Sequence, residues 1–382
     1  MARWSTALGA ALVALCWQGV VCAGQFNNVV SLGDSLFDDI LGARSPVAAE
    51  HVANRLGVPW TNLARSGATT DALLEQGQHT TAAANFGAGD LALVWIGGND
   101  FFYQASLPIA LGLSWRPTLD DAAANLETTL STLRAAGMEV VMFNLPDMAQ
   151  VPFVGLPATN ILGRRERWLQ AYSDLSIEWA HTLGELGAEY GAPVVDVYGM
   201  VNQRLQDPQA FSILGHPVNL GPSFGGQFDI FADPIHPSAY VQGLIANAAI
   251  DVINATYDPL GVMPLERLSV PELAELVGLT AGDFDGDGNV GWRDLFTWEF
   301  NFGAHFEVNV STHGAGDAND DGAINGADFL AWQRQYRASA TTTSVPEPQS
   351  AILIGVALGA VGANCARRRR RAARGDETAA SL

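Results

Sequence analysis

The chain has 382 residues, of which 48% are hydrophobic, so it can bury a sizeable core and is long enough for two or three structural units. Its formal net charge is −20, and all 20 basic residues are Arg. This balance excludes a nucleic-acid-binding surface, because phosphate recognition needs clustered Lys and Arg. The three cysteines, Cys16, Cys22 and Cys365, lie in apolar terminal segments. The body between those segments therefore has no catalytic thiol and no cysteine-based zinc site.

Residues 1–23 have the parts of a signal peptide. Arg3 precedes an apolar stretch, which ends in the small-residue cleavage site Val21-Cys22-Ala23. A buried first helix is the alternative interpretation. The segment predicts that the protein is exported.

Residues 26–256 alternate between apolar runs and helical patterns such as Asp120–Ala136 and Arg164–Tyr190, and a last helix is expected from Pro237 to about Thr256. This alternation predicts a parallel sheet with helices on both faces. Ligands of such sheets bind at the carboxyl ends of the strands, so the residues directly after each run are the first functional candidates. The expected strands are Val29–Leu32, Trp60–Ala64, Leu91–Ile96, Val140–Leu145 and Pro193–Val197.

Four short fragments carry reactive or hydrogen-bonding side chains along this domain. Any one of them alone is more typical of a turn or a helix cap. Their order is more specific, because three follow successive expected strands and the fourth precedes the last helix. The fragments are Gly33-Asp34-Ser35-Leu36, Asn62-Leu63-Ala64-Arg65-Ser66-Gly67, Gly97-Gly98-Asn99-Asp100 and Asp233-Pro234-Ile235-His236-Pro237.

These fragments contain what a serine needs to hydrolyse an ester: a hydroxyl, a base, a group that orients the base, and donors for the oxyanion. Ser35 supplies the hydroxyl at a turn that Gly33 permits. His236 is the candidate base, and Asp233 can fix the imidazole tautomer. The candidate oxyanion donors are the Ser35 N–H, the Gly67 N–H and the Asn99 side-chain amide.

With these fragments the chain resembles the GDSL, or SGNH, hydrolase family over about residues 26–256. The resemblance implies an α/β, flavodoxin-like three-layer sandwich with a five-stranded parallel sheet. It implies Ser35 as nucleophile, His236 as general base and then acid, and Asp233 as the orienting carboxylate. Ser35, Gly67 and Asn99 would form the oxyanion hole, and no cofactor would be needed for catalysis. The stretch Phe37-Asp38-Asp39-Ile40 departs from the family's usual continuation of the first fragment.

Residues 257–280 are expected to be a connector with a short helix, Pro271–Val277, and residues 281–338 contain two acidic twelve-residue loops that start 34 positions apart. Each loop has oxygen-bearing side chains at positions 1, 3, 5 and 12, a Gly at position 6 and an apolar residue at position 8, as Ca²⁺-binding loops do. Position 7 would contribute its carbonyl oxygen. The expected ligands are Asp283, Asp285, Asp287, Asn289 and Asp294 in the first loop, and Asp317, Asn319, Asp321, Ala323 and Asp328 in the second.

Asp at position 12 makes the pair similar to dockerin type I repeats, an all-α EF-hand-type module in which a helix follows each loop. The helices would be Leu295–Phe300 and Phe329–Tyr336. The resemblance implies structural Ca²⁺ and a cohesin-type scaffold as partner. Positions 10 and 11 differ between the copies, Trp292-Arg293 against Gly326-Ala327, so we do not expect symmetric docking. A calcium-stabilised spacer without a partner is the alternative.

After a linker at 339–345, residues 346–371 resemble a PEP-CTERM sorting signal, and residues 372–382 form a tail. Pro346-Glu347-Pro348 precedes an apolar run from Ala351 to Ala363 and the block Arg367–Arg371. The run is short for a full membrane span, and the Arg block would stay cytoplasmic. The resemblance implies a sorting protease as partner, with transient anchoring in the inner membrane before secretion or surface display. A plain membrane anchor is the alternative.

The sequence thus predicts an exported serine ester hydrolase that cleaves acyl or acetyl esters of a carbohydrate or a lipid. The alternative is a non-catalytic carbohydrate- or surface-binding protein on a hydrolase fold. The Gly-x-Ser-x-Gly match at Gly221-Pro222-Ser223-Phe224-Gly225 follows none of the expected strands, which excludes the strand-to-helix elbow of the α/β-hydrolase arrangement. A lipase would need an apolar acyl groove, for which the candidates near the third strand are Trp95, Phe101, Phe102, Tyr103 and Trp115.

Overall fold

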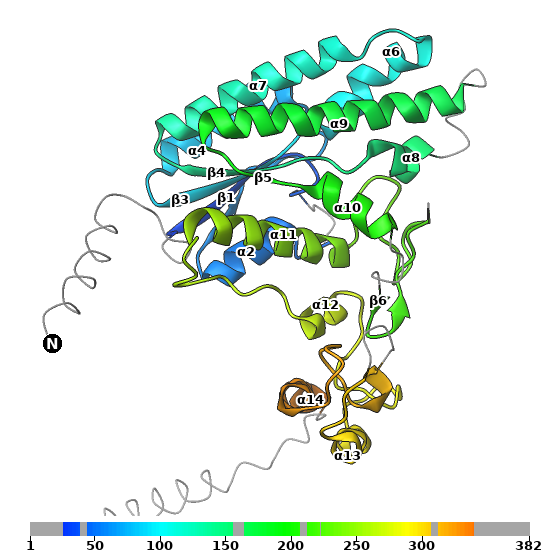
Figure 1. Cartoon of the computed structure of the whole chain (residues 1–382). Helices are drawn as coiled ribbons and strands as arrows, with labels where there is room; N and C mark the ends of the chain where they lie inside the picture. Colours follow the sequence, from blue (N-terminus) through cyan, green and yellow to red (C-terminus); the bar gives the residue numbers. More distant parts are fainter. Residues whose placement is uncertain are drawn as a thin grey trace, which may run out of the picture. The chain divides into compact units, whose positions relative to one another are not determined.

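The computed structural model of the chain describes residues 26–38, 44–155, 164–206, 212–221, 223–306 and 312–339 (Figure 1). The predicted signal peptide, the sorting segment and the tail lie outside these residues, as do nearly all of the linker and the three cysteines. The described residues up to Gln335 belong to one compact unit. Within the described part of the chain, no helix has the length and apolar character to cross a membrane.

A five-stranded sheet forms the centre of this unit, and all of its strand pairs are parallel. The strand order is β2-β1-β3-β4-β5, which confirms the predicted α/β sheet. The chain adds β2 on one side of β1 and then crosses over to add β3 on the other side. Ligands of parallel sheets bind at the carboxyl ends of the strands next to such a switch point. The strands are β1 (Asn28–Gly33), β2 (Trp60–Asn62), β3 (Asp90–Trp95), β4 (Glu139–Phe143) and β5 (Val194–Val195).

Helices cover both faces of the sheet, so the domain has three layers (Figure 1). One layer contains α3 (Thr70–Glu75), α4 (Gln78–Asn85), α7 (Arg116–Ala135) and α9 (Arg165–Tyr190), and the other contains α2 (Ala48–Leu56) and α11 (Ala239–Tyr257). The predicted long helices correspond to α7, α9 and α11. Strand β3 is buried along its whole length, because both faces of its apolar run are covered by helices.

Between the main strands and helices, the chain forms several short helices and strands. None of them was predicted; all but α10, which has ten residues, are too short to show a helical or strand period. They are α5 (Gly98–Asp100), η2 (Phe101–Ala105), α6 (Ser106–Leu111), η3 (Met148–Gln150), α8 (Pro152–Gly155), α10 (Val197–Gln206), β6 (Ser212–Ile213) and β7 (His216–Pro217).

After α11 come α12 (Val270–Leu276), α13 (Trp292–Asn301), η7 (His313–Ala315) and α14 (Gly326–Ser339). The two loop helices were predicted to begin at Leu295 and Phe329, but they begin three residues earlier, inside the acidic loops. Asp294 explains the first case, because its Oδ2 accepts the Gly291 N–H at 2.6 Å and so caps the helix from its first turn. Asp328 accepts the Asn325 N–H at 2.8 Å in the same way.

Candidate active site and acidic loops

The turn after β1 presents Ser35 at the carboxyl edge of the sheet. Gly33 has φ +136°, and a Cβ there would lie 1.9 Å from the carbonyl oxygen of Trp95 on β3. Only glycine allows this approach. The buried side chain of Gln78 accepts the Gly33 N–H at 2.9 Å and donates to the Gly33 carbonyl at 3.1 Å. Gln78 was not predicted, since it is 45 residues away in the chain and no local pattern relates the two.

The structure brings Ser35, His236 and Asp233 together, as the sequence predicted. Ser35 Oγ lies 2.7 Å from His236 Nε2, and His236 Nδ1 lies 2.7 Å from Asp233 Oδ2 and 2.9 Å from Oδ1. Burial raises the pKa of the Asp233 carboxyl, but hydrogen bonds from the Ile235 N–H, the His236 N–H and the imidazole outweigh it and hold that pKa below its ordinary value. Asp233 is therefore an anion that orients the imidazole, and Nε2 faces the serine hydroxyl.

Backbone bonds hold the loop that carries His236 in place. The Ala232 N–H donates to the His236 carbonyl at 2.9 Å, and the Ser238 N–H donates to the Ile230 carbonyl at 2.9 Å. The Phe153 N–H, on α8, donates to the Pro234 carbonyl at 2.8 Å. The loop thus closes on itself immediately before α11 and positions the imidazole over the end of β1.

Of the three expected oxyanion donors, two are backbone amides. Among the described residues, neither the Ser35 N–H nor the Gly67 N–H has an acceptor. Asn99 Nδ2 donates to the Ala68 carbonyl at 2.9 Å, which uses one of its two hydrogens. Ser35 and Asn99 line the same pocket, whereas Gly67 is not among its lining residues.

Asp38 ties the turn of Ser35 to the loop of Gly67. Its Oδ2 accepts the Ser66 N–H at 2.7 Å, and its carbonyl accepts the Ser66 hydroxyl at 3.0 Å. Asp38 belongs to the stretch that departs from the family pattern, and here it positions the residue that precedes Gly67. Asp39 and Ile40 lie outside the described residues.

Two buried carboxyls, Asp34 and Asp100, lie behind the site. Burial, with a smaller contribution from the Asp100 charge, raises the pKa of Asp34 to about 7. Burial likewise raises the pKa of Asp100 to about 6, although Thr70 donates to it from its N–H and its hydroxyl. Asp34 Oδ1 accepts the Leu36 N–H at 2.9 Å. These bonds brace the Ser35 turn and the start of α3, so both carboxyls stabilise the backbone that presents the donors.

A largely apolar pocket opens beside Ser35 and His236. Of the predicted groove residues, Trp95 and Phe102 line it. Phe101 instead packs in the core against Trp179, with ring centres 5.4 Å apart, and neither Tyr103 nor Trp115 lines the pocket. Most of the other lining side chains come from later segments and could not be predicted locally; they include Met148, Val151, Met200, Ile230 and Val241.

The acidic loops have the same hydrogen-bond pattern in both copies. Asp283 accepts the N–H groups of Asp287 and Gly288, at 3.1 and 2.8 Å. Asp317, 34 residues later, accepts those of Asp321 and Gly322, at 3.2 and 2.8 Å. The repeat that the sequence predicted at loop positions 1, 5 and 6 is therefore also present in the backbone hydrogen bonds of the two loops.

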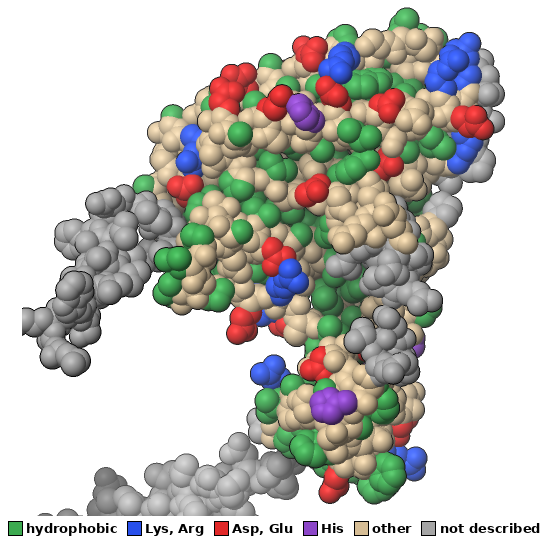
Figure 2. All heavy atoms as spheres, in the orientation of Figure 1, with side chains coloured by type: hydrophobic (Ala, Val, Ile, Leu, Met, Phe, Trp, Pro, Cys, Tyr) green, Lys and Arg blue, Asp and Glu red, His purple; other side chains and the backbone are tan. Residues whose placement is uncertain are grey.

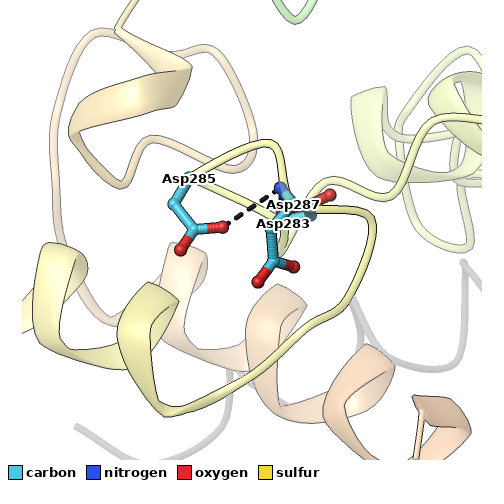
Figure 3. A group of neighbouring side chains, drawn as sticks. All are labelled: Asp283, Asp285 and Asp287. Carbon is cyan, nitrogen blue, oxygen red and sulfur yellow. Dashed lines mark hydrogen bonds between the residues drawn. The ribbon is translucent and has the colours of Figure 1, made fainter.

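The residues present fit a hard divalent cation. Ligand atoms of Asp283, Asp285 and Asp287 lie within 4.8 Å of one another, and Figure 3 shows these side chains on one loop. Burial, and next to it the Asp294 charge, raise the pKa of Asp283, so the loop carries repulsion that a cation would relieve. Asp294 is buried, and both of its carboxylate oxygens accept backbone hydrogen bonds. Oδ1 accepts the N–H groups of Phe284 and Asp285, and Oδ2 accepts that of Gly291. Any metal contact from position 12 would use a remaining lone pair.

In the second loop, Asn319 replaces the carboxylate of position 3. Burial, with a smaller contribution from the Asp317 charge, raises the pKa of Asp328. Ala323 can offer only its carbonyl, which already accepts Asn325 Nδ2 at 3.1 Å. The first loop, with Asn289 at position 7, is the better candidate for tight binding, because it has one more carboxylate.

A serine hydroxyl bonded to an imidazole that a carboxylate orients, at the carboxyl edge of a parallel α/β sheet, defines the class of serine hydrolases. The profile of the GDSL-like Lipase/Acylhydrolase family matches residues 31–242, which is more than half of the chain. The chain belongs to this family and is a hydrolase of ester bonds.

The search of curated proteins found no match. Among solved structures, a lipolytic G-D-S-L family protein from Veillonella parvula is 15% identical, with a TM-score of 0.38, and the match covers 59% of this chain and 97% of that one. The acetylxylan esterase Axe2 from Geobacillus stearothermophilus is 17% identical, with a TM-score of 0.39 and coverage of 59% and 94%. At these identities the likeness concerns the fold alone.

Proposed function

We propose that the protein is an exported serine esterase that works through an acyl-enzyme on Ser35. The observation that carries this proposal is the 2.7 Å contact between Ser35 Oγ and His236 Nε2, with Asp233 bonded to the other imidazole nitrogen. His236 takes the hydroxyl proton as Ser35 Oγ attacks the ester carbon, and then gives that proton to the leaving alcohol. Water, deprotonated by His236, releases the acid and restores Ser35.

The oxyanion formed in each step would receive hydrogen bonds from the Ser35 N–H, the Gly67 N–H and the Asn99 amide. The free state of both backbone amides among the described residues supports this assignment. The remaining hydrogen of Asn99 Nδ2 supports it further.

The pocket supports an ester with an acyl chain of several carbons as substrate. Apart from groups of the site itself, its walls are mainly aliphatic and aromatic side chains. Burying an acyl chain there would contribute about 0.8 kcal/mol for each methylene removed from water. An acetyl group would leave most of this wall unused. A deacetylase, the activity named for the Geobacillus protein, is the second candidate.

Hydrolysis of p-nitrophenyl esters from acetate to palmitate by the full chain tests this proposal, with Ser35→Ala as control. We expect kcat/KM to rise with chain length beyond acetate and turnover to vanish in Ser35→Ala. A maximum at acetate would instead favour deacetylation. No turnover above the Ser35→Ala background would favour the non-catalytic binding protein.

We propose that the acidic loops bind structural Ca²⁺ and that the module around them tethers the enzyme, to a cohesin-type scaffold or as a spacer. The matching bond patterns of the two loops support the calcium site. We further propose that residues 1–23 direct export of the protein and that a sorting protease processes it at residues 346–371. The sequence patterns of these two segments support this part of the proposal.

A further inference from the structure

A stripe of exposed apolar side chains follows η2 and α6. Tyr103, Leu107 and Leu111 are 67%, 65% and 55% exposed, and their spacing of four residues puts them on one helical face. Leu113, 62% exposed, continues the stripe after the helix ends. Single exposed leucines are ordinary, but an uninterrupted row of them marks an interaction surface.

The stripe begins one residue after a side chain that lines the active-site pocket. Phe102, the residue before Tyr103, lines the pocket, and its ring lies 5.5 Å from that of the half-exposed Phe153. Phe153 in turn bonds through its N–H to the carbonyl of Pro234, in the loop of His236. From Phe102 to Leu111 the helix rises only about 14 Å. A molecule bound along the stripe therefore lies within reach of Ser35.

Two cations lie at the far end of the stripe. A Cβ at Gly112 would be 3.9 Å from Nη1 of Arg164 and from Nη1 of Arg167. Both arginines are exposed, and within the described residues no carboxylate pairs with either. Arg116 nearby differs, because it bonds to Glu178 at 2.9 Å. Figure 2 shows Arg side chains gathered at this end of the face, where α6 and α9 lie in Figure 1.

We propose that these six residues (Tyr103, Leu107, Leu111, Leu113, Arg164 and Arg167), called the interfacial edge, bind the surface of a lipid aggregate with phosphate headgroups. The apolar side chains would enter the acyl region, and the two guanidiniums would bind the phosphates. The net charge of −20 does not oppose this binding at contact, because salt screens distant charges beyond about 8 Å. Delivery of a lipid ester into the pocket rests on the proposed function, whereas surface binding does not.

Co-sedimentation with vesicles tests the proposal, with residues 24–345 in their Ser35→Ala form so that no ester is consumed and the apolar, Arg-rich segment 346–371 does not itself bind the vesicles. We expect the protein to pellet with phosphatidylglycerol–phosphatidylcholine vesicles, and less so as salt is raised. Arg164→Gln with Arg167→Gln should weaken this binding about tenfold or more. Leu107→Gln with Leu111→Gln should weaken it similarly.

Matched controls are Arg293→Gln and Leu260→Gln, which remove an exposed Arg and an exposed Leu from outside the edge. Both should bind vesicles like the parent protein. The proposal is overturned if the parent protein does not pellet with these vesicles, or if the edge variants pellet as well as the controls.

Turnover of a soluble short-chain ester, measured with Ser35 intact, separates this proposal from the proposed function. The edge variants should retain the wild-type rate, which also establishes that they are folded. Turnover without vesicle binding would reject the interfacial edge and leave the esterase. Vesicle binding without Ser35-dependent turnover of any ester would reject the esterase and leave the edge.

Discussion

The side-chain amide of Asn99 has two hydrogens, and the Ala68 carbonyl holds one of them. If the other stabilises the oxyanion, Asn99→Ala should lower kcat on a soluble ester by about 100-fold or more, because the interaction strengthens only as charge develops. Steady-state kinetics measures this. Asn125→Ala, which removes an amide bonded to Asp71 and Thr70, is the matched control and should keep its kcat. A near-normal kcat in Asn99→Ala would remove Asn99 from the oxyanion hole.

Asp34 makes stability depend on pH in a predictable direction. Its folded-state pKa of about 7 is above the ordinary value of 3.8, so the folded state binds the proton more tightly than the unfolded state. Its contribution to stability is therefore complete at low pH and is lost as pH rises from about 4 to 7. Between pH 5 and pH 8 this loss is on the order of 2 kcal/mol.

Asp34→Asn removes the titration and keeps an oxygen that can accept the Leu36 N–H. We expect the fall in the free energy of unfolding from pH 5 to pH 8 to be smaller in Asp34→Asn than in the wild type. Urea unfolding at the two pH values measures the difference. An equal fall in both proteins would show that Asp34 is ionised in the folded state throughout this range.

At the scale of elements, the acidic loops and helices α13 and α14 stabilise one another through Asp294 and Asp328. Each carboxylate binds the backbone of its own loop and also caps the helix that follows. Burial, and the charge of Asp294, raise the pKa of Asp283, so repulsion between these two carboxylates opposes the arrangement in the first loop. A bound divalent cation would relieve the repulsion.

We therefore expect Ca²⁺ at about 100 times its dissociation constant to raise the unfolding temperature of the loop module by roughly 10 °C or more. Scanning calorimetry in Ca²⁺ and in EDTA measures this shift, and Asp283→Ala should abolish most of it. Asp121→Ala, an exposed carboxylate on α7, serves as control. Esterase activity should survive EDTA. No shift with Ca²⁺ would reject the calcium site, and loss of activity in EDTA would mean that the module and the active site are coupled.

At the scale of the whole molecule, the active site joins residues that are far apart in the chain. Ser35 and His236 are 201 positions apart, and Gln242 connects the same two segments by accepting the Ala48 N–H and donating to the Leu36 carbonyl. The Ser35 turn is thus attached to α11 directly and to β3 through Gly33. This attachment keeps the hydroxyl within hydrogen-bond distance of the imidazole.

The sequence alone determined the parallel α/β sheet, the position of its five strands to within two residues at each end, and the side chains that meet at Ser35. Each of these depends on local properties, namely the period of apolar residues, turn-forming glycines and the chemical type of residues after a strand. The starts of the two loop helices were predicted wrongly, at Leu295 and Phe329 instead of Trp292 and Gly326. The capping carboxylates Asp294 and Asp328 extend each helix into the acidic loop before it. Only the tertiary structure decided the pocket walls, the partners Gln78 and Gln242, and the placement of Arg164 and Arg167 beside Gly112. These contacts join segments that are far apart in the chain. Packing of the whole domain decides which segments meet, and local sequence periodicity carries no information about that packing.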